Sequence, residues 1–264
     1  GVSASPLGSG VSLTPPYSTT TARHRLASTP VTTVLFVGAG RHQRRAIARV
    51  RELGLRVVAV DRSPVAEADV AETLDFTDID AVEEAGRRHK VAGVLTVASE
   101  RAVPVVAAVA ERLGLPSIGT EVAHRMTNKR AMRQALADAG VPQPRFAPVS
   151  DLGDARDALA EIGTPAVLKP ADSSGQRGVS RVDTEADLDA ALDAALDASP
   201  TGEALLEELV AGVELNTMLV ALRGEPVLLT LSDRLRPPGA GFGVALAHVY
   251  PSSLDGDGLA AAER

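Results

Sequence analysis

The sequence of 264 residues contains no cysteine and no tryptophan, and aromatic residues make up only 2% of it. The absence of cysteine excludes disulfides, thiol catalysis and cysteine-ligated metal centres. With so few aromatic side chains, stacking on nucleic-acid bases is excluded as a main activity. The net charge of −7 points the same way, because a phosphate-backbone partner requires a basic surface. We therefore expect no nucleic-acid partner.

Long hydrophobic runs are also missing, although 45% of the residues are hydrophobic and suffice for a core. No apolar run approaches the roughly 18 residues that a membrane span requires. A signal-like segment is absent as well, so the sequence predicts no membrane partner and a cytoplasmic location.

Lysine is scarce, with only Lys90, Lys129 and Lys169 among 27 basic residues. Where arginine is the usual cation, a lysine can mark a position that needs a compact charge instead of a planar fork. Lys90 closes a predicted helix and is interpreted as a solvated C-terminal charge. Lys129 opens a predicted helix, which is a poor place for a cation, and this favours a functional role.

Lys169 follows a short apolar run, residues 166–168, that is typical of a buried strand. Pro170 then limits further pairing, and a small polar loop follows. A cation between a rigid strand and a loop of backbone N–H groups is an arrangement that binds phosphate. The alternative is a β-hairpin with a long surface turn. The loop residues of interest are Ser173, Ser174, Gly175 and Gly178.

A second strand, residues 204–209, ends in carboxylates and turns at a glycine before Glu214. The alternative is a strand followed by a charged turn. Four motifs, in this order along the chain, resemble those of the ATP-grasp superfamily of ATP-dependent ligases. They are Asn128-Lys129, Lys169-Pro170 with its loop, Glu207-Glu208-Leu209-Val210 and Gly212-x-Glu214. The similarity is to the carboxylate–amine ligase and biotin-carboxylase-like branch, and it covers about residues 31–254.

The resemblance implies ATP as the cofactor. It implies that Lys129 reaches the α-phosphate, that the strand from Glu207 to Val210 holds adenine, and that Glu214 accepts from the ribose hydroxyls. The cofactor-binding residues implied are Lys129, Lys169, Ser173, Ser174, Gly175, Gly178, Glu207, Glu208, Leu209, Val210 and Glu214.

The expected fold class is α/β, with a Rossmann-like N-terminal (pre-ATP-grasp) domain followed by an incomplete two-subdomain ATP-grasp fold. Residues 1–30 lack acidic residues and periodicity, so we expect a disordered leader. Arg23 and Arg25 leave a transit peptide as the alternative. The expected domains are the Rossmann-like domain at 31–119, linking helices at 120–147, a lid subdomain at 148–210 and the start of a C-terminal subdomain at 211–264.

The glycine turn at residues 38–40 and the acidic Asp61 also allow a nicotinamide-binding interpretation. Against it, Gln43 stands where close helix–strand packing needs a small residue. Asp61 is interpreted as a loop cap, with a pocket residue as the alternative.

Two candidates concern the substrates. Glu100 follows a parallel strand, at the edge where open α/β sheets bind ligands, and the resemblance implies that it reaches the acceptor; the alternative is a charge at a helix start. Arg234, with Arg236, is the candidate to clamp a carboxylate or phosphate.

The family uses Mg²⁺ held by a glutamate and a Glu-x-Asn on late strands. We expect these ligands beyond residue 264 and no metal ligand in the chain itself, which implies a fragment or a degenerate relative. The predicted function is an ATP-dependent ligase that activates a small carboxylate as an acyl phosphate for attack by an amine, this chain being an inactive fragment of it. A homodimer is the assembly allowed for. The alternatives are a non-catalytic ATP-binding protein and an NAD-dependent oxidoreductase.

Overall fold

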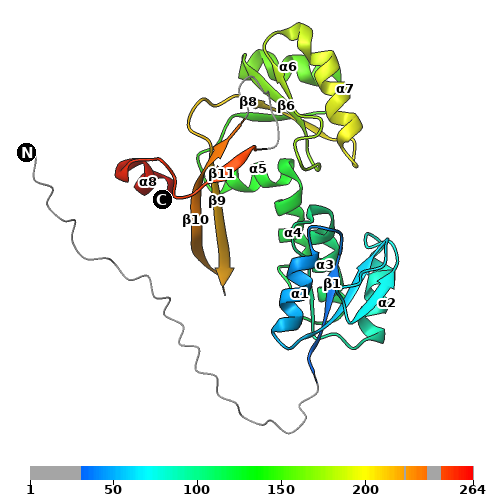
Figure 1. Cartoon of the computed structure of the whole chain (residues 1–264). Helices are drawn as coiled ribbons and strands as arrows, with labels where there is room; N and C mark the ends of the chain where they lie inside the picture. The colour runs from blue at the N-terminus through cyan, green and yellow to red at the C-terminus, as the bar shows by residue number, and fades with distance from the viewer. Residues whose placement is uncertain (1–30, 223, 237–244, 264) are drawn as a thin grey trace, which may run out of the picture. The chain divides into compact units, whose positions relative to one another are not determined.

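The computed structural model describes residues 31–222, 224–236 and 245–263, so the predicted leader at 1–30 lies outside it. Figure 1 shows the elements along the chain. The strands are β1 (Thr33–Val37), β2 (Arg56–Asp61), β3 (Val70–Thr73), β4 (Gly93–Leu95), β5 (Phe146–Val149), β6 (Ala166–Pro170), β7 (Ser180–Val182), β8 (Ala204–Glu208), β9 (Leu215–Leu222), β10 (Glu225–Leu235) and β11 (Ala247–Val249). The helices are α1 (Arg44–Glu52), α2 (Ile79–Arg88), α3 (Val103–Arg112), α4 (Thr120–Thr127), α5 (Lys129–Asp138), α6 (Leu152–Ile162), α7 (Leu188–Ala198) and α8 (Gly256–Glu263).

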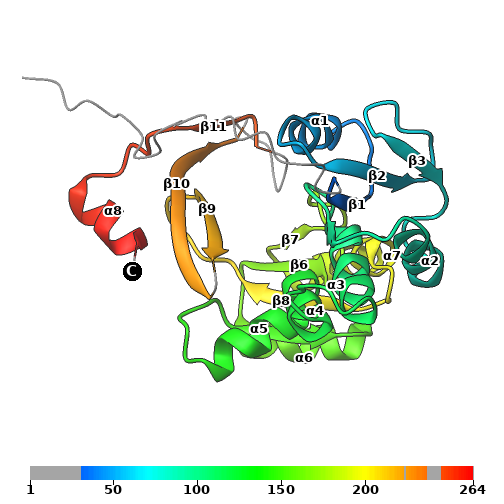
Figure 2. The same cartoon turned by 90° about the horizontal axis from the view of Figure 1, so that it is seen from below.

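Four parallel strands in the order β3-β2-β1-β4 form the first sheet. Every residue of β1 is buried, as in a parallel strand that is covered on both faces. Leu35 and Val37 pack with residues of α2 and α3, whereas Val34 and Phe36 pack with Ile47 of α1. Figure 2 shows α1 on one side of these strands and α2 and α3 on the other. The predicted Rossmann-like arrangement is confirmed.

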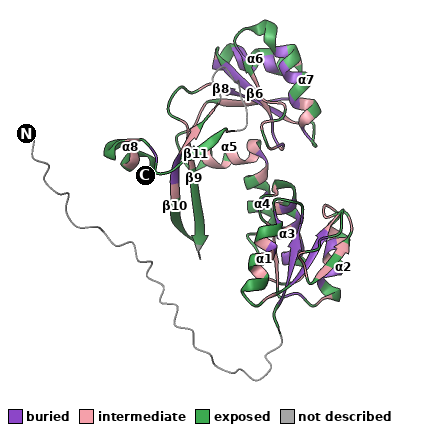
Figure 3. Ribbon diagram, viewed as in Figure 1, coloured by how far each residue is buried: buried purple, intermediate pink, exposed green. Residues whose placement is uncertain are grey.

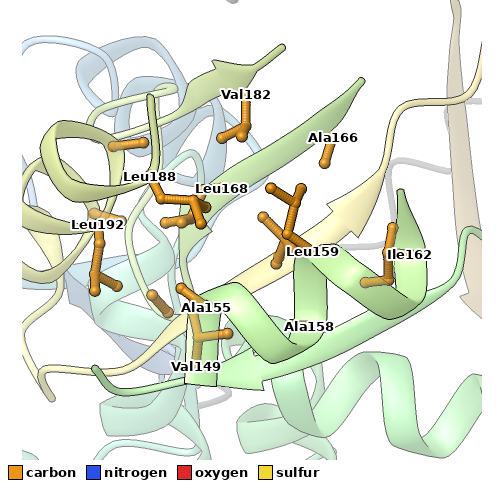
Figure 4. Packing of buried hydrophobic residues seen from close by; sticks show 14 residues of the cluster. Val149, Ala155, Ala158, Leu159, Ile162, Ala166, Leu168, Val182, Leu188 and Leu192 are labelled. Carbon is orange, nitrogen blue, oxygen red and sulfur yellow. The ribbon is translucent and has the colours of Figure 1, made fainter. Parts of the chain in front are cut away.

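The second sheet is antiparallel, in the order β5-β8-β6-β7, and α6 and α7 pack against one face of it. Its core, drawn in Figure 4, includes Ala166 and Leu168 of β6 and Leu206 of β8. Side chains alternate between the two faces of a strand. Lys169 and Glu207 therefore point to the face opposite this core.

The third sheet is a long antiparallel hairpin of β9 and β10 with β11 at its edge. Figure 3 shows that much of the hairpin is exposed. β10 continues through Leu235, where Arg234 and Leu235 pair with His248 and Ala247 of β11. The glycines at 239, 241 and 243 lie outside the described residues.

The mixed α/β architecture is therefore as expected, whereas the domain boundaries stay predictions. None of the helices in the described part of the chain combines the length and the apolar character that crossing a membrane would need.

Candidate nucleotide site

Lys169 and Glu207 meet on the face of the second sheet that is turned away from its helices. The register places Glu207 opposite Val167, so Lys169, two residues further along β6, is its diagonal neighbour. The Lys169 ammonium lies 2.6 Å from Glu207 Oε2. The side chains are only 16% and 5% exposed, so the two opposite charges are paired largely out of water.

Arg133 of α5 forms a fork on the same carboxylate. Its Nε donates to Glu207 Oε1 at 2.9 Å and its Nη2 donates to Oε2 at 3.0 Å. Gln143 Nε2 donates to the backbone carbonyl oxygen of Arg133 at 2.9 Å. Glu207 therefore accepts from two cations, and Oε2 is shared between them.

These contacts shift two protonation equilibria. Burial lowers the pKa of the Lys169 ammonium below its ordinary value; the charge of Glu207 opposes this, while those of Arg133 and Lys129 add to it. Burial alone would raise the pKa of Glu207. The hydrogen bonds from Arg133 and the charge of Lys169 outweigh that effect, so the pKa of Glu207 lies below its ordinary value. Glu207 is accordingly a carboxylate at neutral pH.

Lys129 lies at the first turn of α5, which Asn128 caps by accepting from Ala131 N at 3.0 Å. The backbone N–H of Lys129 donates to the carbonyl oxygen of Ala171 at 2.7 Å. Its ammonium donates to the carbonyl oxygen of Ser173 at 2.6 Å. The start of α5 is thus tied at two points to the loop that follows β6.

Both lysines line one cavity of about 370 Å³, within the size range of small-molecule and cofactor sites. The carboxylates that line it are Glu100, Glu207 and Glu214. The side-chain oxygen of Gln176, which also lines the cavity, is buried without a hydrogen-bond partner among the described residues. Of the predicted site residues, the cavity brings together Glu100, Lys129, Lys169, Ser173, Ser174, Gly175, Glu207, Glu214 and Arg234.

Glu214 is paired with arginines in the same way that Glu207 is paired with Lys169. Arg234 and Arg236, both on or next to β10, make ion pairs with its two carboxylate oxygens. Arg234 N also donates to the Glu214 carbonyl oxygen at 3.1 Å. The carboxylate expected to meet ribose is therefore held by the two side chains expected to meet substrate.

Four predicted residues are not among those that line the cavity. Gly178 packs against α7, where a Cβ atom would lie 2.5 Å from the Ala194 carbonyl oxygen, so its place is explained by close packing. Glu208 pairs with Arg145 at the surface. Leu209 follows β8, and Val210 is 62% exposed. Their adenine-binding role stays a prediction from the resemblance.

The glycine turn after β1 is filled by the protein's own groups. Asp61 Oδ2 accepts from Ala39 N at 2.6 Å, and Oδ1 accepts from Ser63 N. Gln43 donates to the carbonyl oxygens of Val97 and Ala98. Asp61 thus caps its own loop and the turn, and Gln43 fixes the neighbouring strand end.

Sequence reasoning missed Arg133. A usable signal was present, because Arg133 lies four residues after Lys129 and two such residues share one helix face. For magnesium, no group of three or more His, Asp or Glu side chains that could hold a metal ion occurs among the described residues.

A comparison with protein families matches the part of the chain that contains the two lysines. Residues 128–218 match the family model described as "Carbamoyl-phosphate synthase L chain, ATP binding domain", which is an ATP-grasp domain. The matched segment contains every element of the site from Lys129 to Glu214. Together with the fold, the match confirms the resemblance to the ATP-grasp superfamily in its carboxylate–amine ligase branch.

Individual relatives agree with this class. The chain is 33% identical over 158 residues to formate-dependent phosphoribosylglycinamide formyltransferase of Synechococcus sp. (strain CC9902), covering 58% of this chain and 40% of the relative. It is 33% identical over 156 residues to the uncharacterized protein y4rH of Sinorhizobium fredii, covering 55% of this chain and 32% of the relative. The chain therefore spans about a third to two fifths of these curated relatives.

Among solved structures, the ADP complex of N5-carboxyaminoimidazole ribonucleotide synthetase has a similar fold. Its TM-score is 0.72 at 20% identity, and the match covers 89% of this chain and 62% of that one. At this identity the similarity establishes the fold alone. The predicted fold class is confirmed.

Proposed function

We propose that this chain contributes the nucleotide-binding part of an ATP-dependent carboxylate–amine ligase. The observation that carries the proposal is that Lys129 and Lys169, two of only three lysines, line the same cavity although they lie on different elements. Two ammonium groups beside a loop of backbone N–H groups match the charge of a polyphosphate. The matched ATP-binding family and the ADP-bound structural relative support the nucleotide as the ligand.

Different residues bind different parts of the nucleotide. Lys129 and Lys169 take the phosphates, and the loop with Ser173, Ser174 and Gly175 supplies N–H groups and cover. Glu214 accepts from the ribose hydroxyls, and the end of β8 meets the adenine. Positioning and charge neutralisation are what phosphoryl transfer needs from a protein.

The reaction proceeds in two steps. A substrate carboxylate oxygen attacks the terminal phosphorus of ATP, forming an acyl phosphate and releasing ADP. The amine then attacks the acyl carbon, and inorganic phosphate leaves as the C–N bond forms. Magnesium accompanies the nucleotide in such reactions and would neutralise charge on its phosphates.

Substrate contacts are assigned to Glu100 and Arg234. Glu100 lines the cavity and also a larger neighbouring one of about 570 Å³. Its carboxylate would accept from the amine, and Arg234 would hold the carboxylate of the acid. The domain boundaries predicted from the sequence, with a lid at 148–210, form part of the same proposal.

Isothermal titration calorimetry with ATP, ADP and NAD, each with and without Mg²⁺, tests this function. Binding of ATP and ADP without binding of NAD supports it. Binding of NAD without ATP would overturn it in favour of an oxidoreductase. Release of phosphate from ATP only when a carboxylate and an amine are added would show that this chain is active as a ligase, whereas binding without release is the result expected of an inactive fragment.

A further inference from the structure

The buried carboxylate of Glu207 has two counter-ions where one would neutralise it. Lys169 donates to Oε2 at 2.6 Å, while Arg133 spans both oxygens at 2.9 and 3.0 Å. Arg133 is 15% exposed on its side chain, and it is not among the described residues that line the cavity. It therefore faces the carboxylate and not the ligand space.

The second counter-ion matters once a polyphosphate enters. Lys169 has to leave or share its contact with Glu207 to reach a phosphate oxygen. A buried carboxylate deprived of its counter-charge is strongly unfavourable. The guanidinium of Arg133 already donates to both carboxylate oxygens.

We propose that Arg133 is a positioning residue for nucleotide binding: it keeps Glu207 paired while Lys169 turns from Glu207 to the phosphate. Glu207 thus pairs with the Lys169 ammonium before a ligand binds. Arg133 lowers the free-energy cost of separating Lys169 from Glu207. This inference rests on the proposed function, because it assumes a polyphosphate in the cavity.

The test separates this role from a contact with adenine. Tripolyphosphate has the charge of the ATP phosphates but no base. Titration calorimetry with tripolyphosphate therefore reports the phosphate contacts alone, and titration with ATP reports the phosphate and adenine contacts together. We expect R133M to raise the Kd for both ligands by about tenfold or more. R133K, which keeps the charge but not the fork, should fall between R133M and the wild type.

The decisive comparison is the double variant. E207Q removes the charge that Arg133 compensates, so R133M/E207Q should bind tripolyphosphate within about threefold of E207Q alone. A matched control is R130M on the same helix, because Arg130 makes an exposed pair with Glu203 at 3.3 Å. R130M should bind as the wild type does.

Wild-type affinity in R133M, or a double variant as weak as R133M, would overturn the inference and leave the proposed function standing. A loss for ATP alone, with tripolyphosphate unaffected, would also overturn it and assign the pair to adenine. If the wild type binds neither ligand, the proposed function falls and takes this inference with it. Circular dichroism checks folding; if R133M is unfolded, R133K against R133K/E207Q provides the same comparison.

Discussion

Two glycine-containing turns follow buried strands in this protein, and they differ in the charged side chains beside them. In the turn after β1, Asp61 accepts from Ala39 N at 2.6 Å, and Gln43 bonds to carbonyl oxygens of the next strand end. In the loop after β6, the ammonium of Lys129 contacts the Ser173 carbonyl oxygen and shares a cavity with Lys169. The first turn is closed by an internal carboxylate that accepts from its backbone, whereas the second lies beside two lysines in a cavity that Glu100, Glu207 and Glu214 also line.

The difference shows why a glycine pattern alone is weak evidence for a nucleotide. Both turns supply backbone N–H groups, but only groups without an internal acceptor can serve a ligand. A carboxylate already bound to the turn also repels an incoming phosphate. The chemistry around the turn, and not the glycines, distinguishes the two sites.

The largest expected effect comes from Gly178→Ala, which tests what the second loop's glycines do. Gly178 has φ +68°, and a Cβ atom there would lie 2.5 Å from the Ala194 carbonyl oxygen. Strained backbone and forced repacking should lower the free energy of unfolding by about 2–4 kcal/mol, measured by urea denaturation. Gly175→Ala, with φ +68° but no atom within 4 Å, is the control and should cost about 1–2 kcal/mol. Equal losses would show that packing against α7 is irrelevant.

Lys169→Ala tests whether the lysine beside the second turn binds phosphate. Losing one charged contact to phosphate should weaken ATP binding by about 1.5–3 kcal/mol, or roughly 10- to 150-fold, in calorimetry. Lys90→Ala, at the end of α2, should bind ATP as the wild type does. Unchanged affinity in Lys169→Ala would remove the site from this cavity.

Asp61→Ala tests the other turn. It removes the acceptor of two backbone N–H groups, so the unfolding free energy should fall by about 1–2 kcal/mol, while the Kd for ATP stays unchanged. Asp61→Ala should thus change stability and not ATP affinity, whereas Lys169→Ala should mainly change ATP affinity. If the wild type binds NAD and Asp61→Ala does not, our interpretation of the two turns would be reversed.

The pH dependence of stability follows from Glu207. Its pKa is lower in the folded protein than in the unfolded chain, so its contribution is present above the unfolded value and is lost as the pH falls through the folded one. Below about pH 5 the wild type should therefore lose stability more steeply than Glu207→Gln in urea titrations. Parallel curves for the two proteins would contradict the assigned direction.

The smallest effect is expected for Glu208→Ala. Glu208 neighbours Glu207 in sequence but points to the other side of β8, where it pairs with Arg145 at 3.3 Å in an exposed position. ATP affinity should change by less than about threefold. A loss comparable to that of Lys169→Ala would restore the sequence-based assignment of Glu208 to the site.

Much of the site was predictable because its residues are marked by local contrast. Lys169 ends a buried strand, and Lys129 stands at a helix start where a cation is unfavourable. Arg133 was not predictable as a partner of Glu207, since their contact depends on how α5 packs against β8. The pairing of Glu214 with Arg234 depends likewise on the register of the β9–β10 hairpin, which alternation of side chains does not fix.

The attachment of α5 has a consequence for how a ligand is met. Lys129 is tied by its backbone to Ala171 and by its ammonium to Ser173, and Arg133 ties the same helix to β8. The helix and the second sheet are therefore tied together by three contacts, which hold the backbone positions of Lys129 and Lys169 next to each other. A ligand spanning the two lysines needs only their side chains to reorient, as when Lys169 turns from Glu207, which reduces the entropy lost on association.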